Sequence, residues 1–141
     1  MIDFNSTMDS QITFYHSQVQ RLHNDLYPKD YLLKQVIRSK KFIDNNFSEP
    51  MSLNDIAGEA YLSKFHFIRS FRNCYGVTPH QYLIRVRVAE AKKLIRSGTL
   101  IAAACYAVGF ESLPSFANLF KKLTGTTPLA CQLKQLKSNI R

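Results

Sequence analysis

The sequence predicts an all-α protein of about seven helices plus an N-terminal helix, and two observations support this fold class. Apolar residues recur at intervals of three and four along most of the 141 residues, and few segments alternate with the period of two that is typical of strands. The stretch FRNCYGVTP, residues 71–79, returns 49 positions later as FKKLTGTTP, residues 120–128. Phe, Gly, Thr and Pro occupy matching positions in both, which indicates that the chain repeats a helical unit.

Three helices are expected between residues 30 and 76, each with a recognisable start. Asp30 can cap the first helix, whose expected apolar stripe is Leu33, Val36, Ile37, Ile43 and Phe47. The stretch SLND, residues 52–55, predicts a capping box for a short second helix. The residues expected on its buried side are Leu53, Ile56, Ala57 and Ala60. Ser63 can cap a third helix, which Gly76 ends in the left-handed conformation.

Four further helices are expected after residue 77. Thr78 and Pro79 suit the N-cap and the first position of a long helix that stops at Gly98. Its predicted core stripe is Ile84, Val88, Ala91 and Ile95. A small apolar helix follows at about 100–107, and a turn at Gly109 and Phe110 leads into a sixth helix at about 113–124. The sixth helix is expected to end at Gly125, and a seventh helix is expected to begin at Thr127 and Pro128.

The elements divide the chain into an N-terminal helical extension, residues 1–30, and a helical domain, residues 31–141. The domain has a first unit at 31–77, a linker helix at 78–98 and a second unit at 99–141. Each unit pairs a short helix with a helix that carries two phenylalanines four positions apart, Phe67 with Phe71 and Phe116 with Phe120. Residues four apart share a helix face, so each pair points inward and leaves the opposite face free, as in a helix-turn-helix.

The net charge of +9 is unevenly distributed. Residues 1–30 carry four acidic and two basic side chains, whereas residues 31–141 carry six acidic and 17 basic ones. A compact domain with this excess repels itself unless it works with a polyanion. Nucleic acid is therefore the first candidate partner, and an anionic membrane surface is the second. A membrane surface is not expected, because no basic helix combines strong amphipathicity with an exposed apolar face.

The chain resembles the DNA-binding domain of the AraC/XylS family of bacterial transcription regulators over about residues 31–133. The motifs that carry the resemblance are SLNDIA, LSKFHFIRSFR, GVTPHQYL, RVAEAKKLI, VGFES and FKKLTGTTP, in the order and at the spacing of the family. The resemblance implies two helix-turn-helix subdomains joined by one long helix. It also implies an activator that binds promoter DNA as a monomer or a side-by-side pair and recruits RNA polymerase.

The resemblance further implies where DNA is contacted. The implied base-reading residues are Phe65, Ile68 and Arg69 in the first unit and Leu113, Pro114, Ser115 and Asn118 in the second. Arg69 suits bidentate bonding to guanine, although a solvated arginine or a phosphate clamp is an alternative, and Phe65 and Ile68 can equally pack on the linker helix. The residues expected on DNA phosphate are Ser63, Lys64, Arg72, Arg87, Lys121 and Lys122. Since Leu113 and Pro114 cannot hydrogen-bond base edges through their side chains, we expect the first unit to supply most of the specificity.

Other classes of function are not expected. His66 has neither a nucleophile nor a carboxylate at triad-like spacing, and the four histidines form no metal-ligand cluster, so the sequence predicts no enzyme, metal or cofactor. Cys74, Cys105 and Cys131 include no C-x-x-C pair and are expected to be buried, reduced thiols. The N-terminus lacks the layout of a signal peptide, and the apolar runs are too short to span a bilayer, so we expect a cytoplasmic protein.

The N-terminal extension contains an apolar seam at intervals of three and four, made of Ile12, Tyr15, Val19, Leu22 and Leu26. Two interpretations stay open: a helix packed against the basic domain, and a helix at residues 10–27 that forms a homodimer or ends a linker from a longer regulator. For the whole chain the sequence predicts a sequence-specific regulator that inserts two recognition helices into adjacent major grooves of duplex DNA. The alternative is a helix-turn-helix protein-interaction module, a co-regulator with weak and non-specific DNA affinity, which the apolar tip at Leu113 and Pro114 favours.

Overall fold

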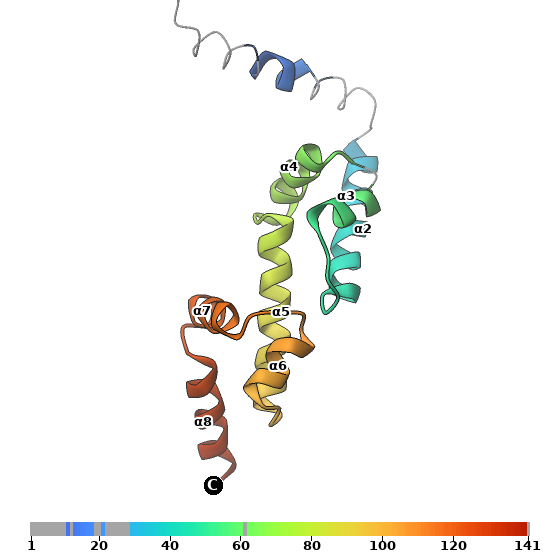
Figure 1. Ribbon diagram of the computed structural model, residues 1–141. Helices are drawn as coiled ribbons and strands as arrows, with labels where there is room; N and C mark the ends of the chain where they lie inside the picture. Colours follow the sequence, from blue (N-terminus) through green and yellow to red (C-terminus); the bar gives the residue numbers. More distant parts are fainter. Residues whose placement is uncertain (1–10, 12, 19–20, 22–28, 61, 141) are drawn as a thin grey trace, which may run out of the picture.

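The computed structural model describes residues 11, 13–18, 21, 29–60 and 62–140, and every regular element in that part of the chain is a helix (Figure 1). The helices from residue 29 onward are α2 (Lys29–Asn46), α3 (Leu53–Glu59), α4 (Lys64–Tyr75), α5 (Pro79–Arg96), α6 (Ile101–Ala107), α7 (Leu113–Thr124) and α8 (Pro128–Asn139). The all-α fold with a long central helix is thereby confirmed. Helix α2 begins two residues before the predicted domain boundary at residue 31.

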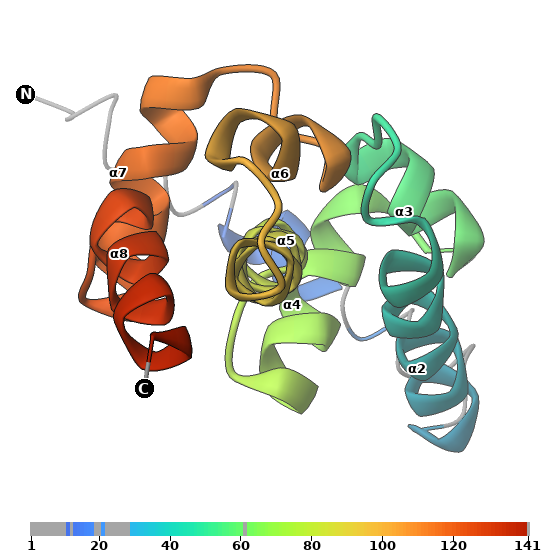
Figure 2. The same ribbon diagram turned by 90° about the horizontal axis from the view of Figure 1, so that it is seen from below.

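Helix α5 is the axis of the molecule. In Figure 1, α2, α3 and α4 surround its upper half, and α6, α7 and α8 surround its lower half. Figure 2, which looks along α5, shows α2 and α3 on one side of this axis and α7 and α8 on the other. Helix α5 contacts each of the other six helices. Its 18 residues give it a length of about 27 Å at 1.5 Å per residue.

Two separate hydrophobic cores lie along this axis, one in each unit. The first consists of Val36, Ile43, Ile56, Ala57, Ala60, Leu62, Phe67, Phe71 and Leu83. The second consists of Val88, Ala91, Ile95, Ala104, Cys105, Val108, Phe116, Phe120 and Cys131. Both phenylalanine pairs are fully buried, as their spacing predicts. Helix α5 contributes to both cores because Leu83, which the predicted stripe omitted, faces the first core and Val88 faces the second.

The repeated stretch is the same helix exit and helix entry built twice. Gly76 and Gly125 end α4 and α7 in the left-handed conformation, with φ of 75° and 79°. Each glycine N–H donates to the carbonyl four residues earlier, at 2.8 Å in both cases. Thr78 and Thr127 then cap α5 and α8, accepting the N–H of the third helical residue at 3.2 Å and 3.1 Å. The predicted capping box at residues 52–55 is also confirmed.

The face that α2 buries differs from the predicted stripe. Leu33 and Ile37 are 48% and 38% exposed, whereas Val36, Ser39 and Ile43 are fully buried. Ser39 can lie in the core because its hydroxyl donates to the Val36 carbonyl at 2.6 Å within the same helix. Asp30, expected as the cap, is a helical residue in the first turn of α2.

Two further expectations are tested by residue exposure. Cys105 and Cys131 are buried as predicted, but Cys74, in the last turn of α4, is exposed. In the N-terminal seam, Ile12, Val19, Leu22 and Leu26 lie outside the described residues. Tyr15 is described and is 66% exposed. The homodimer through residues 10–27 therefore stays a prediction.

A polar cluster joins α2 to α4 and α5 beside the first core. The Lys40 ammonium lies 3.0 Å from a carboxylate oxygen of Asp44, whose other oxygen accepts the Tyr82 hydroxyl at 2.5 Å. The same ammonium lies over the rings of Tyr75 and Tyr82, 5.9 Å and 5.3 Å from their centroids. The hydrogen bond to Asp44, with a smaller contribution from Tyr82, raises the pKa of Lys40 to about 12.

We expect Lys40→Met to lower the free energy of unfolding at pH 7 by about 0.5–1 kcal/mol, since the pair is partly exposed to solvent. Because the folded pKa of Lys40 is raised from 10.5 to about 12, its contribution is complete below pH 10.5 and is lost as the pH rises to about 12. The difference between variant and wild type should therefore shrink over that interval. Chemical denaturation at several pH values measures it, with Lys41→Met on the exposed side of α2 as the control.

Candidate nucleic-acid interface

The outward face of α4 is an exposed basic surface. Phe67 and Phe71 occupy the inner side of α4 and anchor it in the first core. On the outer side Phe65 is 78% exposed, and Lys64, Arg69 and Arg72 are exposed as well. Ile68, predicted as a base reader, is half-buried. Ser63, predicted to contact phosphate, is exposed and caps the helix by accepting the His66 N–H at 3.4 Å.

Helix α7 presents a matching face in the second unit. The residues exposed on it are Pro114, Ser115, Asn118, Lys121 and Lys122. Ser115, Asn118 and Lys122 share one side of the helix because they are spaced by three and four positions. Leu113, predicted as a base reader, is half-buried and packs against the second core. The predicted polar and basic residues of this unit therefore lie together on the exposed face, while the Leu113 side chain is partly buried.

Charge and placement make the two faces similar. The sequences KFHFIRSFRNCY of α4 and LPSFANLFKKLT of α7 contain basic residues and no aspartate or glutamate. Figure 1 shows α4 near the upper end of α5 and α7 beside its lower half. The two basic faces therefore lie at different levels along one helix of about 27 Å.

Arg87, which the sequence predicted to contact phosphate, is bonded within the protein. Its Nε donates to the Phe47 carbonyl at 2.7 Å, and an Nη donates to the Glu49 carbonyl at 3.0 Å. Desolvation by burial lowers the pKa of this guanidinium, although the nearby Glu111 carboxylate opposes the shift. The two carbonyl partners of Arg87 lie 40 and 38 positions away in sequence, so no local pattern predicts the bonds.

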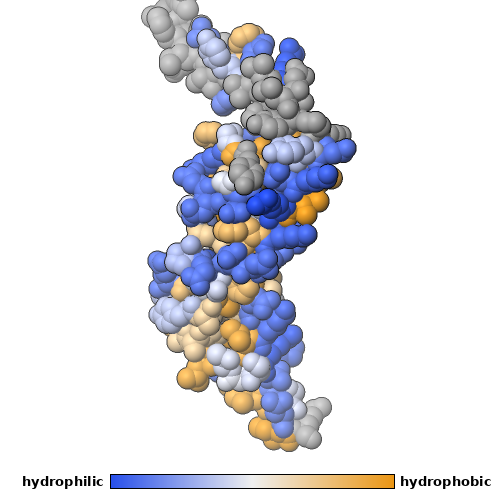
Figure 3. Space-filling model, turned by 90° about the vertical axis from the view of Figure 1, so that its right-hand side faces the viewer, coloured by the Kyte–Doolittle hydropathy of each residue, from blue (hydrophilic) through white to orange (hydrophobic). Residues whose placement is uncertain are grey.

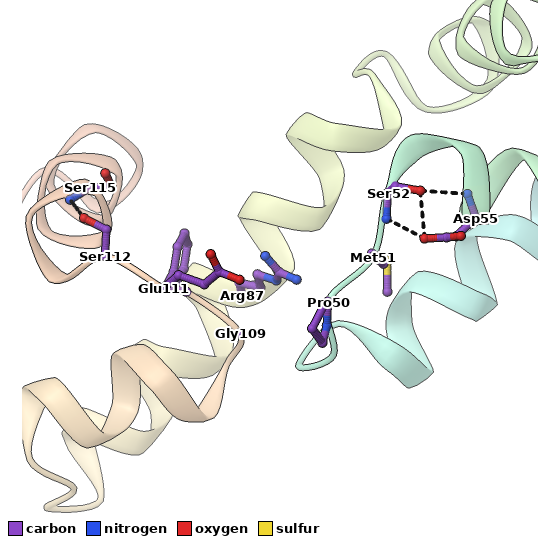
Figure 4. A pocket seen from close by; sticks show the side chains of 10 residues that line it. Pro50, Met51, Ser52, Asp55, Arg87, Gly109, Glu111, Ser112 and Ser115 are labelled. Carbon is purple, nitrogen blue, oxygen red and sulfur yellow. Dashed lines mark hydrogen bonds between the residues drawn. The ribbon is translucent and has the colours of Figure 1, made fainter.

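An open cleft separates the two units next to Arg87 (Figure 4). It has a volume of about 550 Å³ and is lined by Pro50, Met51, Ser52, Asp55, Arg87, Gly109, Phe110, Glu111, Ser112 and Ser115. The carboxylates of Asp55 and Glu111 lie on its opposite sides. A hydrogen bond from the Ser52 backbone lowers the pKa of Asp55, so this carboxyl is ionised at neutral pH. For Gly109 and Phe110 the sequence predicted only a turn.

Within the described ranges, no group of three or more histidine, cysteine, aspartate or glutamate side chains is placed to hold a metal ion. Nor does any helix of this part of the chain have the length and apolar character needed to cross a membrane.

Comparisons with known proteins identify relatives of this chain. The profile of a helix-turn-helix domain family matches residues 56–133, more than half of the chain. A Bacillus subtilis protein named bifunctional transcriptional activator/DNA repair enzyme AdaA is 39% identical over 89 residues, which are 62% of this chain and 42% of AdaA. The HTH-type transcriptional activator AarP of Providencia stuartii is 31% identical over 99 residues, 70% of this chain and 73% of AarP. The chain spans less than half the length of AdaA and of several other curated relatives.

Solved structures agree with the sequence comparison. The DNA-binding domain of the global transcriptional factor AdpA, solved in complex with a target DNA, superposes with a TM-score of 0.67 at 25% identity, over 70% of this chain and 90% of that domain. A probable AraC family transcriptional regulator from Rhodopseudomonas palustris has the same fold, with a TM-score of 0.67 at 22% identity over 72% of this chain and 97% of that one. The chain therefore belongs to the AraC family of helix-turn-helix transcription regulators.

Proposed function

We propose that this chain is a sequence-specific regulator that binds duplex DNA by inserting α4 and α7 into adjacent major grooves on one face of the duplex. The observation that carries the proposal is the pair of exposed, acid-free basic faces at two levels of α5. One turn of B-form DNA rises about 34 Å, and the linker helix spans about 27 Å, so the separation suits consecutive grooves. The AdpA domain, solved in complex with a target DNA, has the same fold and supports DNA binding by this chain.

The two faces differ in what they can recognise. On α4, Arg69 can donate two hydrogen bonds to guanine, and the exposed Phe65 ring can meet a thymine methyl group. On α7, Ser115 and Asn118 offer hydrogen bonds, and Asn118 suits adenine. Lys64, Arg72, Lys121 and Lys122 are assigned to phosphate, which requires only charge and reach. The first unit is therefore assigned most of the specificity, and the second most of the grip on the backbone.

The named activities of the relatives extend the proposal to the promoter. AdaA and AarP are both called transcriptional activators. We assign this chain the same role, with promoter DNA as its ligand and RNA polymerase as its protein partner. In a bacterial cell both are found in the cytoplasm.

Selection of bound sequences from a pool of random duplexes, at moderate salt, tests the proposal. It should enrich a site with two conserved blocks about one helical turn apart, the block under α4 carrying more information. Enrichment of no sequence at all, with equal affinity for every duplex, would contradict the proposal.

Removal of a phosphate-binding lysine is expected to weaken binding to all duplexes by a similar factor. Lys121→Ala should lower affinity by a similar factor for preferred and random sequences, and should reduce the slope of log affinity against log salt by about 1. Titrations at four or five salt concentrations measure this slope. Lys134→Ala removes an exposed lysine of α8, a helix that belongs to neither face, and is the control. A changed base preference with an unchanged slope would assign Lys121 to a base instead.

The protein-interaction alternative is favoured by one observation on α8. Its outward side carries an aliphatic stripe at intervals of four, three and four, made of Leu129, Leu133, Leu136 and Ile140, with exposed fractions of 56%, 49%, 54% and 84%. Figure 3 shows hydrophobic residues reaching the surface toward the lower end of the molecule, where α8 lies in Figure 1. Such a stripe on a surface helix is typical of a protein contact. A chain that fails the selection above but retains a helical fold would favour this function.

A further inference from the structure

We propose that Arg87, Gly109 and Phe110 form a joint that fixes the orientation of the two units, and that this joint sets the spacing of the two half-sites in the bound DNA. The joint is defined by these three residues and by the carbonyl groups of residues 47–49 that they contact. The inference rests on the proposed function, because spacing has a meaning only for a protein that reads two grooves.

The side chain of Arg87 touches both units at once. Arg87 belongs to α5, and the two carbonyls that its guanidinium binds, of Phe47 and Glu49, belong to the loop between α2 and α3 in the first unit. The centre of the same guanidinium lies 5.9 Å from the centroid of the Phe110 ring, in the turn of the second unit. Because the two bonds come from different nitrogens of a planar fork, they fix the direction of the side chain as well as its position.

At Gly109 the backbones of the two units meet. A Cβ atom at this position would lie 3.0 Å from the carbonyl oxygens of Phe47 and Ser48 and 3.1 Å from the Arg87 guanidinium carbon. Two of these neighbours are backbone atoms, which cannot swing aside as a flexible side chain can. Gly109 also has a φ of 101°, which residues with a side chain rarely adopt. The turn of the second unit therefore reaches the loop of the first only because residue 109 is glycine.

The Phe47 side chain strengthens the same connection, since it packs against the hydrophobic cores of both units. The extensive helix packing is either within one unit or with α5. Beside the joint lies the open cleft of about 550 Å³ (Figure 4), with the N-termini of α3 and α7 on its two sides. The joint is thus a narrow connection next to a gap, a place where loss of contact permits rotation of one unit against the other.

The consequence for DNA binding follows from pre-organisation. When the units are fixed, binding of α4 in one groove brings α7 to the next groove with no further loss of conformational freedom. A rigid pair also rejects half-sites at the wrong spacing, because each added base pair rotates the second groove around the duplex. A loosened pair binds the correct site more weakly and tolerates a wrong spacing better.

The test uses Gly109→Ala with a matched control, Gly98→Ala. Gly98 has a φ of 99°, almost the same backbone strain, but a Cβ there meets no atom within 4 Å. Affinities are measured for the selected duplex and for duplexes with one or two base pairs inserted between the two blocks. We expect the affinity of wild type and of Gly98→Ala to fall at least about tenfold when two base pairs are inserted. Gly109→Ala should bind the parent duplex at least about tenfold more weakly than wild type does. Its affinity should fall less than about threefold when two base pairs are inserted.

Arg87→Lys separates the joint from a direct DNA contact. A lysine keeps the charge that a phosphate contact requires, but it lacks the fork that bonds two carbonyls. The joint predicts that this variant tolerates the insertion as Gly109→Ala does, whereas a phosphate contact predicts wild-type behaviour. The inference is overturned if Gly109→Ala and Arg87→Lys both keep the wild-type dependence on spacing.

A measurement without DNA keeps this inference distinct from the proposed function. Spin labels on the exposed Cys74 of α4 and on a Lys134→Cys variant of α8 report the distance between the units. Cys105 and Cys131 are buried, and burial raises the pKa of the Cys105 thiol, so they react slowly. Gly109→Ala should broaden a single narrow distance distribution, and Gly98→Ala should not. An unchanged distribution in Gly109→Ala contradicts the joint, whereas failure of wild type to select any duplex contradicts only the proposed function.

Discussion

Arg69→Ala is expected to erase the preference for one base in the block that α4 reads and to weaken binding of the preferred duplex by about 1–3 kcal/mol. Arg69 is exposed on the outer side of α4, opposite the buried Phe67 and Phe71. A guanidinium that bonds O6 and N7 of one guanine distinguishes that base from the other three. Alanine removes both bonds and leaves the core of the unit intact, so the loss should fall on specificity.

Repeating the duplex selection with the variant measures this effect, because the information content at each position can be compared with wild type. Arg72→Ala is the matched control, since Arg72 is exposed on the same helix and is assigned to phosphate. It should weaken all duplexes alike and leave the selected sequence unchanged. If Arg69→Ala selects the wild-type site with undiminished information, the assignment of Arg69 as a base reader is wrong.

Phe116→Ala is expected to destabilise the second unit by about 3–5 kcal/mol, the cost of removing a large side chain from a filled core. Phe116 is fully buried, and its ring lies 5.2 Å and 5.6 Å from the ring centroids of Phe110 and Phe120. Because the two cores share no buried residue, the damage should be confined to one unit. The variant should lose amide protection in α6, α7 and α8 while α2, α3 and α4 keep theirs.

Hydrogen exchange under native conditions measures this localisation. Phe67→Ala is the corresponding control, since Phe67 is fully buried in the first core. This variant should lose amide protection in α2, α3 and α4 instead. Equal loss of protection in both units from either variant would show that the domain unfolds as one cooperative body.

The ends of the helices were predictable from the sequence because their chemistry is local. Gly76 and Gly125 supply the left-handed exit, and Thr78 and Thr127 supply an oxygen to an N–H three residues later, so each signal is contained within a few positions. The direction of the two exposed faces followed in the same way from the spacing of the buried phenylalanines.

Some features were not predicted because they depend on partners far along the chain, or on buried polar groups that form hydrogen bonds within their own helix. The buried face of α2 includes Ser39, whose hydroxyl bonds a carbonyl of its own helix, so an apolar pattern alone points to the wrong stripe. The role of Arg87 depends on two carbonyls in a loop about 40 positions earlier. The partial burial of Leu113 and Ile68 likewise depends on how their helices sit on the cores.

Protection of a selected duplex against methylation of its major-groove guanines tests most directly whether both helices act together. Binding by α4 and α7 predicts two protected major-groove segments about 10 base pairs apart on one face of the duplex, with both protections lost in parallel as salt rises. Protection of a single groove, or of two grooves on opposite faces, would contradict the account.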